Sequence, residues 1–287
     1  MSRANKVLLS FGHGYSAKAL APHLLSDGWR IFGTTRSEEK RADIAATGVE
    51  ALKWPGEDLK DILATADHLL ISAAPNPEGD PVLMAFGKEI AAHARRLRWV
   101  GYLSTTGVYG DHAGAWVDEH TALNPATKRG QLRVEAETAW RDIPDLPLHI
   151  FRLAGIYGPG RGPFAKVRKG TARRIIKAGQ IFSRIHVEDI AQALLLSIAS
   201  PTPGSIYNLC DDEPAPPEDV IAHAAALLSL PIPPAVAFEE AEMTPMARSF
   251  YAESKKVRND LIKKELGWKP IYPNYRTGLT SLLASSG

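Results

Sequence analysis

Short apolar runs alternate with segments of helical periodicity along the first half of the chain. The run Lys6–Phe11 precedes two glycines, and apolar residues then recur at helical spacing from Ala17 to Leu25. Pro22 weakens this expected helix, and Gly28 ends it. Later runs with the length of buried strands are Trp29–Thr34, His68–Ala73, Arg98–Ser104 and His149–Leu153, and an alanine-rich helix is expected at 84–97. This repetition of strand and helix predicts an α/β fold with a parallel sheet and helices on both faces.

The pattern changes after residue 155. Proline and glycine cluster at 158–163, 201–204, 214–217 and 231–234. Such clusters mark turns between short elements. The sequence therefore predicts a doubly wound Rossmann domain over residues 1–155 and a smaller C-terminal substrate lobe over 156–287. Within that lobe, we expect residues 184–209 to return to the main sheet.

Composition narrows the class of protein further. The chain has 287 residues, of which 45% are hydrophobic, and its net charge is only +2. No large positive field favours nucleic acid or a membrane surface as a partner. The apolar run near the N-terminus is too short for a secretory leader, and no run approaches a bilayer span. The lone Cys210 has no disulfide partner in the chain and is read as a buried thiol, so a cytoplasmic protein is expected.

The residues between the first strand and the first helix, GHGYSA at 12–17, form a candidate phosphate cradle. Gly12 would make the tight turn, and Gly14 would let the backbone approach a pyrophosphate. Ala17 would allow close packing of helix and strand, with Tyr15 and Ser16 opening the helix beside the phosphates. The alternative interpretation is a tight turn without a ligand.

The end of the second strand reads GTTRS at 33–37. An NAD site usually has an acidic residue here to bind the ribose hydroxyls, and this chain has Thr35 and Arg36 instead. A guanidinium beside hydroxyl groups suits a 2′-phosphate, so NADP is favoured over NAD as the cofactor. An ordinary surface arginine is the alternative.

Several motifs in a fixed order resemble the extended short-chain dehydrogenase/reductase superfamily, of the nucleotide-sugar epimerase/dehydratase type. They are GHGYSA, SAAP at 72–75, LSTTGVYG at 103–110, FRLAGIYGPG at 151–160, RIHVEDIAQAL at 184–194, YNLCDDEP at 207–214 and ELGWKP at 265–270. The resemblance implies that Ala73, Ala74 and Pro75 line the cofactor ribose. It also implies a Ser or Thr after the fourth expected strand, which is Thr105 here, and a Tyr-x-x-x-Lys pair on the next helix.

The expected tyrosine and lysine are missing from this chain. Alignment on the neighbouring proline and glutamate puts Arg129 and Arg133 at these positions, on a helix expected at 125–141. Arginine stays protonated near neutrality, so Arg129 cannot act as the acid/base that the resemblance assigns to tyrosine. Arg133 can keep the ribose-binding role of the lysine, and we expect it to face the cofactor while Arg129 faces an open cleft. Together they could bind a carboxylate or phosphate, or both could be solvent-facing in a site without chemistry. The resemblance thus indicates an atypical subgroup.

Other residues near the expected site are candidates to replace the missing tyrosine. Tyr109 and Tyr157 lie in motifs that the resemblance marks as structural, and His112, Glu119 and His120 occupy the loop after the VYG motif. His186, Glu188 and Asp189 are read as a structural segment, so no metal site is predicted. The basic run at 164–180 is compatible with an anionic substrate and equally with a solvated surface.

Two functions stay open at this stage. The first is an NADP(H)-dependent oxidoreductase or epimerase acting on a hydroxyl or carbonyl of a small molecule, with a sugar nucleotide as one candidate. The second is a non-catalytic NADP(H)-binding sensor or interaction protein. Related members form homodimers partly through the 125–141 helix, which is charged here, so dimerisation is an open expectation.

Overall fold

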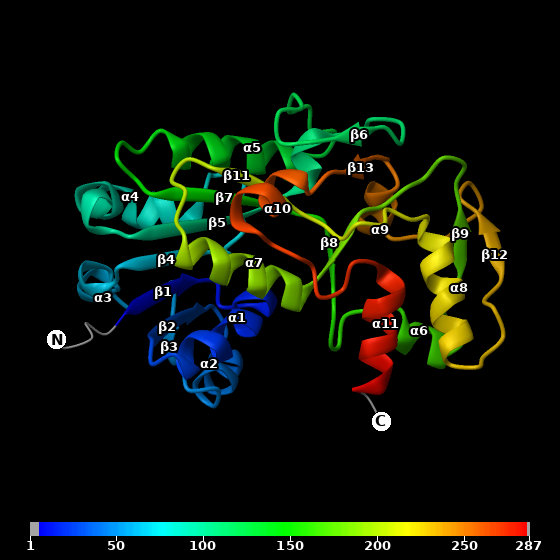
Figure 1. Cartoon of the computed structure of the whole chain (residues 1–287), viewed down its shortest axis with the longest axis horizontal. Coiled ribbons are helices and arrows are strands. Elements are labelled where there is room, and N and C mark those ends of the chain that lie inside the picture. Colours follow the sequence, from blue (N-terminus) through cyan, green and yellow to red (C-terminus); the bar gives the residue numbers. More distant parts are fainter. Residues whose placement is uncertain (1–5, 286–287) are drawn as a thin grey trace. The chain divides into compact units, whose positions relative to one another are not determined.

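A computed structural model describes residues 6–285 and contains a seven-stranded parallel sheet (Figure 1). From edge to edge the strand order is β3-β2-β1-β4-β5-β7-β11. The direction of winding reverses between β1 and β4, which is where open α/β sheets bind ligands at the strands' carboxyl ends. The strands are β1 (Val7–Phe11), β2 (Arg30–Thr35), β3 (Glu50–Lys53), β4 (His68–Ile71), β5 (Trp99–Thr105), β7 (Leu148–Leu153) and β11 (Ile206–Leu209).

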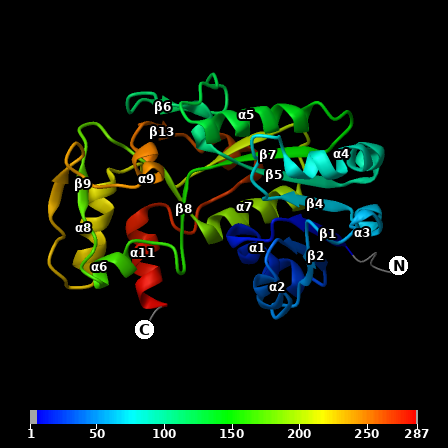
Figure 2. The ribbon, with the colours of Figure 1, turned by 180° about the vertical axis from the view of Figure 1, so that it is seen from behind.

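Helices cover both faces of this sheet (Figures 1 and 2). They are α1 (Tyr15–Ser26), α2 (Glu38–Ala45), α3 (Lys60–Thr65), α4 (Pro81–His93), η1 (Ala94–Arg96), α5 (Lys128–Arg141) and α7 (Val187–Ala199). Helices α4 and α5 lie on one face, and α1 and α7 lie on the other. Large side chains of the strands, such as Phe11 and Tyr102, pack against Phe86 of α4 and Trp140 of α5 in one buried core. Burial of such side chains is the main stabilising contribution.

The predicted α/β Rossmann fold is confirmed, and the predicted strands lie within two residues of the observed ones. Strand β3 and helices α2 and α3 were not predicted. Strand β3 is an edge strand of half-exposed residues, so its sequence lacks an apolar run. Helix α5 begins at Lys128 rather than at the expected residue 125, and α4 begins at Pro81 because Asp80 caps it by accepting from the Val82 and Leu83 amides.

The chain divides into two compact units. Unit 1 comprises the described residues up to Thr105 together with Leu132–Arg152 and Ile190–Tyr207. Unit 2 comprises Thr106–Gln131, Leu153–Asp189 and the described residues from Asn208 onward. Of the segment 184–209, strand β11 lies in the large sheet, whereas β10 (Arg184–His186) pairs with β8 (Gly155–Tyr157).

Unit 2 is built from short elements. Its remaining strands and helices are η2 (Thr106–Tyr109), β6 (Trp116–Val117), α6 (Phe164–Arg168), β9 (Arg174–Ile176), α8 (Pro217–Leu227), β12 (Ala235–Ala237), α9 (Pro245–Phe250), β13 (Lys256–Val257), α10 (Asp260–Leu266) and α11 (Tyr275–Ala284). Helices α6, α8 and α11 share a separate apolar core. No helix within residues 6–285 has the length and apolar character needed to cross a bilayer.

Candidate nucleotide-binding site

The turn after β1 is hydrogen-bonded to the end of β2. The Gly12 amide donates to Thr34 Oγ1 over 2.8 Å, and the His13 amide donates to the Thr34 carbonyl over 2.8 Å. Gly12 has φ 75°, and a Cβ at this position would lie 2.9 Å from the Ala73 backbone nitrogen. Only glycine therefore fits between the ends of β2 and β4, as the sequence predicted for the tight turn.

Gly14 differs from Gly12 in what surrounds it. It is exposed, it is the N-cap of α1, and its φ of −99° is open to any residue. A Cβ here would meet only the Gly12 carbonyl oxygen, at an ordinary 3.6 Å. The protein itself therefore does not require glycine at position 14, and the space beside it is open.

The first turn of α1 follows directly with Tyr15, Ser16 and Ala17. Ala17 is 2% exposed and packs in the core, which is the role expected of a small third residue. The first amides of a helix lack acceptors within the helix and carry partial positive charge. This geometry suits a phosphate group at the start of α1.

Arg36 comes immediately after β2 and is exposed. Within residues 6–285 its guanidinium makes no hydrogen bond or ion pair, whereas the nearby Arg41 pairs with Glu57 at 2.8 Å. Thr35 Oγ1 accepts from the Ser37 amide, which shapes the bend that carries Arg36. A cation without a carboxylate partner at this strand end is available for an anionic ligand.

The predicted residues Ala73, Ala74 and Pro75 follow the end of β4, next to β1 in the sheet. The Ser72 and Ala73 amides both donate to the Phe11 carbonyl, which holds this segment against the glycine turn. Unit 1 thus brings the predicted turn, the Arg36 bend and the segment 73–75 to the carboxyl edge of the sheet.

His13 was not predicted as part of this site. It is 4% exposed, neither ring nitrogen has a hydrogen-bond partner among the described residues, and its ring packs on Gly33. Burial, aided by the charge of Lys18, lowers the pKa of His13 to about 4. The ring is therefore neutral at physiological pH, and its position inside the turn could only be seen once the backbone was folded.

The predicted Thr105 and Arg133 also lie in unit 1. Thr105 is the last residue of β5 and is half-buried. Arg133 extends from α5 to the same strand, where its Nη1 donates to the Tyr102 hydroxyl over 3.0 Å and to the Leu103 carbonyl over 2.8 Å. The arginine that replaces the expected lysine is therefore held at the carboxyl end of β5.

A buried ion pair anchors the next turn of α5. Glu137 and Arg152 are each 3% exposed and lie 2.7 Å apart, and the Ser104 hydroxyl donates to the same carboxylate. Removing one partner of such a pair leaves a buried charge unpaired, which typically costs about 3–5 kcal/mol. Helix α5 is thus fixed to β5 and β7 by polar contacts as well as by apolar packing.

Arg129 has a different environment from Arg133, although both are on α5. It belongs to unit 2, it is exposed, and its guanidinium carbon lies 5.3 Å from the centre of the Phe250 ring. No carboxylate pairs with it among the described residues. The structure therefore places an unpaired cation, rather than a group that could exchange a proton, where the tyrosine was expected.

The alternative acid/base candidates in unit 2 have structural contacts. Tyr109 is fully buried and donates to Asn208 Oδ1 over 2.8 Å, and Glu119 accepts from the Asn208 amide. Burial raises the pKa of Tyr157 well above its ordinary value. His112 contacts the Tyr109 carbonyl through Nε2.

The segment containing His186, Glu188 and Asp189 supports the backbone of unit 2. The Asp189 carboxylate accepts from the amides of Ile271 and Tyr272, and burial raises its pKa to about 6. The ring of His186 lies 5.1 Å from that of Tyr157. Within residues 6–285 no group of three or more potential metal-ligand side chains comes together.

Two further sequence features also lie in unit 2. Cys210 is buried, and burial raises the pKa of its thiol well above the ordinary value, so it is a poor nucleophile. In the basic run at 164–180, Lys177 donates to the Tyr251 carbonyl and lies 5.2 Å from the centre of the Phe238 ring.

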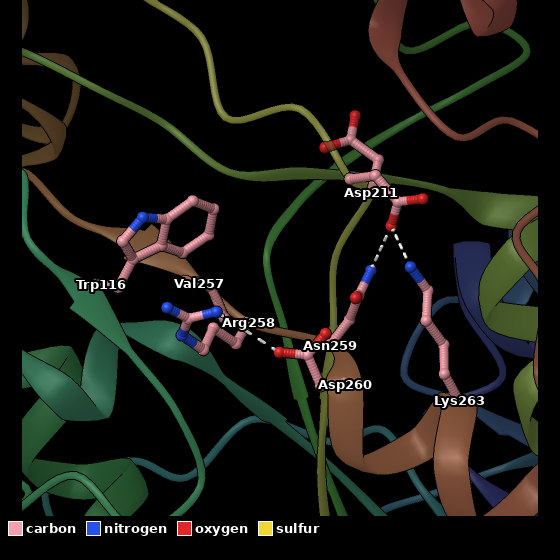
Figure 3. A pocket seen from close by; sticks show the side chains of 8 residues that line it. Trp116, Asp211, Val257, Arg258, Asn259, Asp260 and Lys263 are labelled. Carbon is pink, nitrogen blue, oxygen red and sulfur yellow. Dashed lines mark hydrogen bonds and ion pairs between the residues drawn. The ribbon is translucent and has the colours of Figure 1, made fainter.

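Unit 2 also contains a polar pocket of about 140 Å³ (Figure 3). Four of its charged side chains form two ion pairs, Arg258 with Asp260 at 3.5 Å and Lys263 with Asp212 at 2.5 Å. The carboxylate oxygens of Asp211, which also lines the pocket, make no hydrogen bond among the described residues. None of the predicted site residues lines it.

Comparison with known proteins places this architecture in a family. Protein YeeZ from Escherichia coli strain K12 is 31% identical over 211 residues, which cover 69% of this chain and 75% of that protein. The chain belongs to the family of protein YeeZ. A functionally unknown conserved protein from Silicibacter pomeroyi DSS is 61% identical, with a TM-score of 0.94 over 98% of this chain and 99% of that chain. No protein-family model matches the sequence.

More distant structures link the YeeZ-family chain to the epimerase/dehydratase fold. The UDP-glucuronic acid 4-epimerase from Bacillus cereus, solved with UDP-glucuronic acid and NAD, has a TM-score of 0.78 at 15% identity. The match covers 98% of this chain and 100% of that chain. At this identity the likeness establishes the fold, and the resemblance seen in the sequence is confirmed at that level. The proposed subgroup without Tyr-x-x-x-Lys stays a prediction.

Proposed function

We propose that this protein binds NADP(H) in unit 1 and is an atypical epimerase/dehydratase-like oxidoreductase. Its substrate would be a small, anionic molecule with a hydroxyl or carbonyl group, and a sugar nucleotide is one candidate. The observation that carries the proposal is the pair formed by the open glycine turn and the unpaired Arg36 at the carboxyl ends of β1 and β2. The epimerase from Bacillus cereus, which has the same fold, is complexed with NAD.

Each part of unit 1 would have a distinct role in this proposal. The amides after Gly14 would receive the pyrophosphate, and Arg36 with Thr35 would bind the 2′-phosphate. Ala73, Ala74 and Pro75 would line a ribose, and Arg133 would donate to the other ribose. The nicotinamide supplies hydride transfer when it is bound.

Thr105 is the proposed group that polarises the substrate oxygen by donating a hydrogen bond. Arg129 cannot carry the proton, because a guanidinium stays charged in this pH range. The proton would therefore move through water or through a group of the substrate.

The test is turnover of NADPH, followed by absorbance, against a panel of carbonyl compounds that includes anionic and sugar-nucleotide members. We expect slow turnover with an anionic member, and we expect Thr105→Ala to lower kcat about 100-fold, the order reported for loss of one oxyanion-type donor. Turnover unaffected by Thr105→Ala would contradict the assigned role. Cofactor binding with no turnover on any member would instead favour the sensor function, because position 129 has no proton-transfer group.

A further inference from the structure

Arg133 is held by two groups of one strand. Its Nη1 donates to the Tyr102 hydroxyl over 3.0 Å and to the carbonyl of the adjacent Leu103 over 2.8 Å. Its guanidinium carbon also lies 5.5 Å from the centre of the Tyr102 ring. A guanidinium is planar. The two hydrogen bonds from Nη1 therefore also set the directions in which Nε and Nη2 can donate.

Nε and Nη2 of Arg133 are available to a ligand. Within residues 6–285 the side chain makes no other hydrogen bond and no ion pair, and it is only half-buried. The Asp80 carboxylate is near enough to interact electrostatically, its Oδ1 accepts from the Val82 and Leu83 amides, and its Oδ2 makes no hydrogen bond among the described residues. Among the described residues, the hydrogen bonds that orient the guanidinium therefore all come from β5.

Tyr102 has the rigidity that an anchor requires. It is fully buried in the core between β5 and helices α4 and α5, with its ring 6.1 Å from that of Trp140. Burial raises the pKa of its hydroxyl above the ordinary value, so the group is a neutral phenol that accepts from Arg133. A free arginine side chain samples many rotamers, and this contact selects one of them.

We infer that Tyr102 is a positioning residue for the cofactor: its hydroxyl fixes Arg133 so that Nε and Nη2 donate to the ribose on the nicotinamide side. This inference rests on the proposed binding of NADP(H) in unit 1. In this inference Arg133 binds the ribose with the help of Tyr102. A lysine, which is shorter, would bind the ribose without such an anchor. The ordering of the side chain before binding would improve affinity, since less conformational entropy is lost in the complex.

The test is a double-mutant cycle on the dissociation constant of NADP, measured by calorimetry for wild type, Tyr102→Phe, Arg133→Ala and the double variant. Tyr102→Phe should weaken binding about five-fold, the usual effect of one hydrogen bond. Arg133→Ala should weaken it more, and the double variant should bind as Arg133→Ala does, because Tyr102 acts only through Arg133. If Tyr102→Phe does not fold, Tyr102→Met tests the same loss of the hydroxyl with an adaptable side chain.

Tyr207→Phe is the matched control. Tyr207 is also a fully buried tyrosine of unit 1, and its hydroxyl contacts Thr202 Oγ1 at 2.8 Å. Its loss should lower the unfolding temperature and leave the NADP dissociation constant unchanged. Additive effects of Tyr102→Phe and Arg133→Ala, or an unchanged dissociation constant in Tyr102→Phe, would overturn the role of Tyr102. No binding of NADP by the wild type would overturn the proposed cofactor site and the inference together.

Discussion

The glycine turn after β1 and the first turns of α5 both lie where the epimerase/dehydratase pattern has functional groups, but they relate to that pattern differently. The turn keeps the pattern, and its contacts are made by backbone atoms: Gly12 is closed in by Ala73, and Gly14 faces open space. Helix α5 departs from the pattern, with Arg129 and Arg133 where the sequence predicts the tyrosine and lysine positions. The difference separates the binding role proposed for the turn from proton transfer, for which neither arginine is suited.

The two arginines of α5 sharpen this contrast. Arg133 is tied to β5, at the edge of the sheet that carries the glycine turn, and Arg129 lies over Phe250 in unit 2. Arg133 thus lies in the unit that holds the proposed cofactor residues, and Arg129 is an exposed cation without a carboxylate partner among the described residues. A site can retain cofactor recognition after its acid/base group has been replaced, since the two depend on different residues.

The largest expected effect is on the turn. Gly14→Val should abolish measurable binding of NADP, at least a 100-fold loss, because branched carbon atoms would enter the space proposed for the pyrophosphate. The fold should persist, since a Cβ at position 14 meets only an ordinary contact at 3.6 Å. Calorimetry and circular dichroism on the same sample measure both quantities.

Gly162→Val is the control for this substitution. Gly162 lies in unit 2, and a Cβ there would meet nothing within 4 Å. It should bind NADP as the wild type does. A folded Gly14→Val variant with normal affinity would mean that the motif is only a turn and that the contrast with α5 does not exist.

A smaller effect concerns the pH dependence of stability. Burial lowers the pKa values of His13, His149 and His186 to about 4, below the ordinary 6.5. At these three histidines the unfolded chain binds protons between pH 6.5 and pH 4 that the folded chain does not, so their contribution to stability falls as the pH falls. His13 alone should contribute up to about 3 kcal/mol of this loss.

His13→Phe keeps a ring of similar shape over Gly33 and cannot titrate. Urea unfolding from pH 7 to pH 4.5 should show a smaller loss of stability in the variant than in the wild type, because one histidine with a lowered pKa no longer titrates. Identical pH dependence in both proteins would show that His13 is not the neutral, buried group described for the turn.

Much of the fold could be predicted from the sequence. Buried strands such as β4 and β5 are continuous apolar runs, and the glycine turn is visible because backbone strain at Gly12 excludes other residues. Strand β3 was missed because an edge strand with half-exposed residues has no such run. The boundary proposed between lobes 1–155 and 156–287, and the homodimer, stay predictions.

The site was harder to predict where it depends on contacts between distant residues. The spacing on α5 identified Arg129 and Arg133. Arg133 and Tyr102 are 31 positions apart in the sequence, and only the packing of α5 on β5 brings them together. Tyr102 looks like any apolar strand residue in the sequence. His13 was overlooked for a similar reason, since its burial depends on Gly33 of the neighbouring strand.

The central claim is that unit 1 binds a dinucleotide with a 2′-phosphate, and paired calorimetric titrations with NADP and NAD test it most directly. Charged hydrogen bonds from Arg36 should make NADP bind about 10- to 100-fold more tightly than NAD. Arg36→Ala should make the two affinities equal, whereas Arg41→Ala, which removes an arginine already paired with Glu57, should leave the preference intact. Equal affinities in the wild type, or a preference that survives Arg36→Ala, would contradict the account.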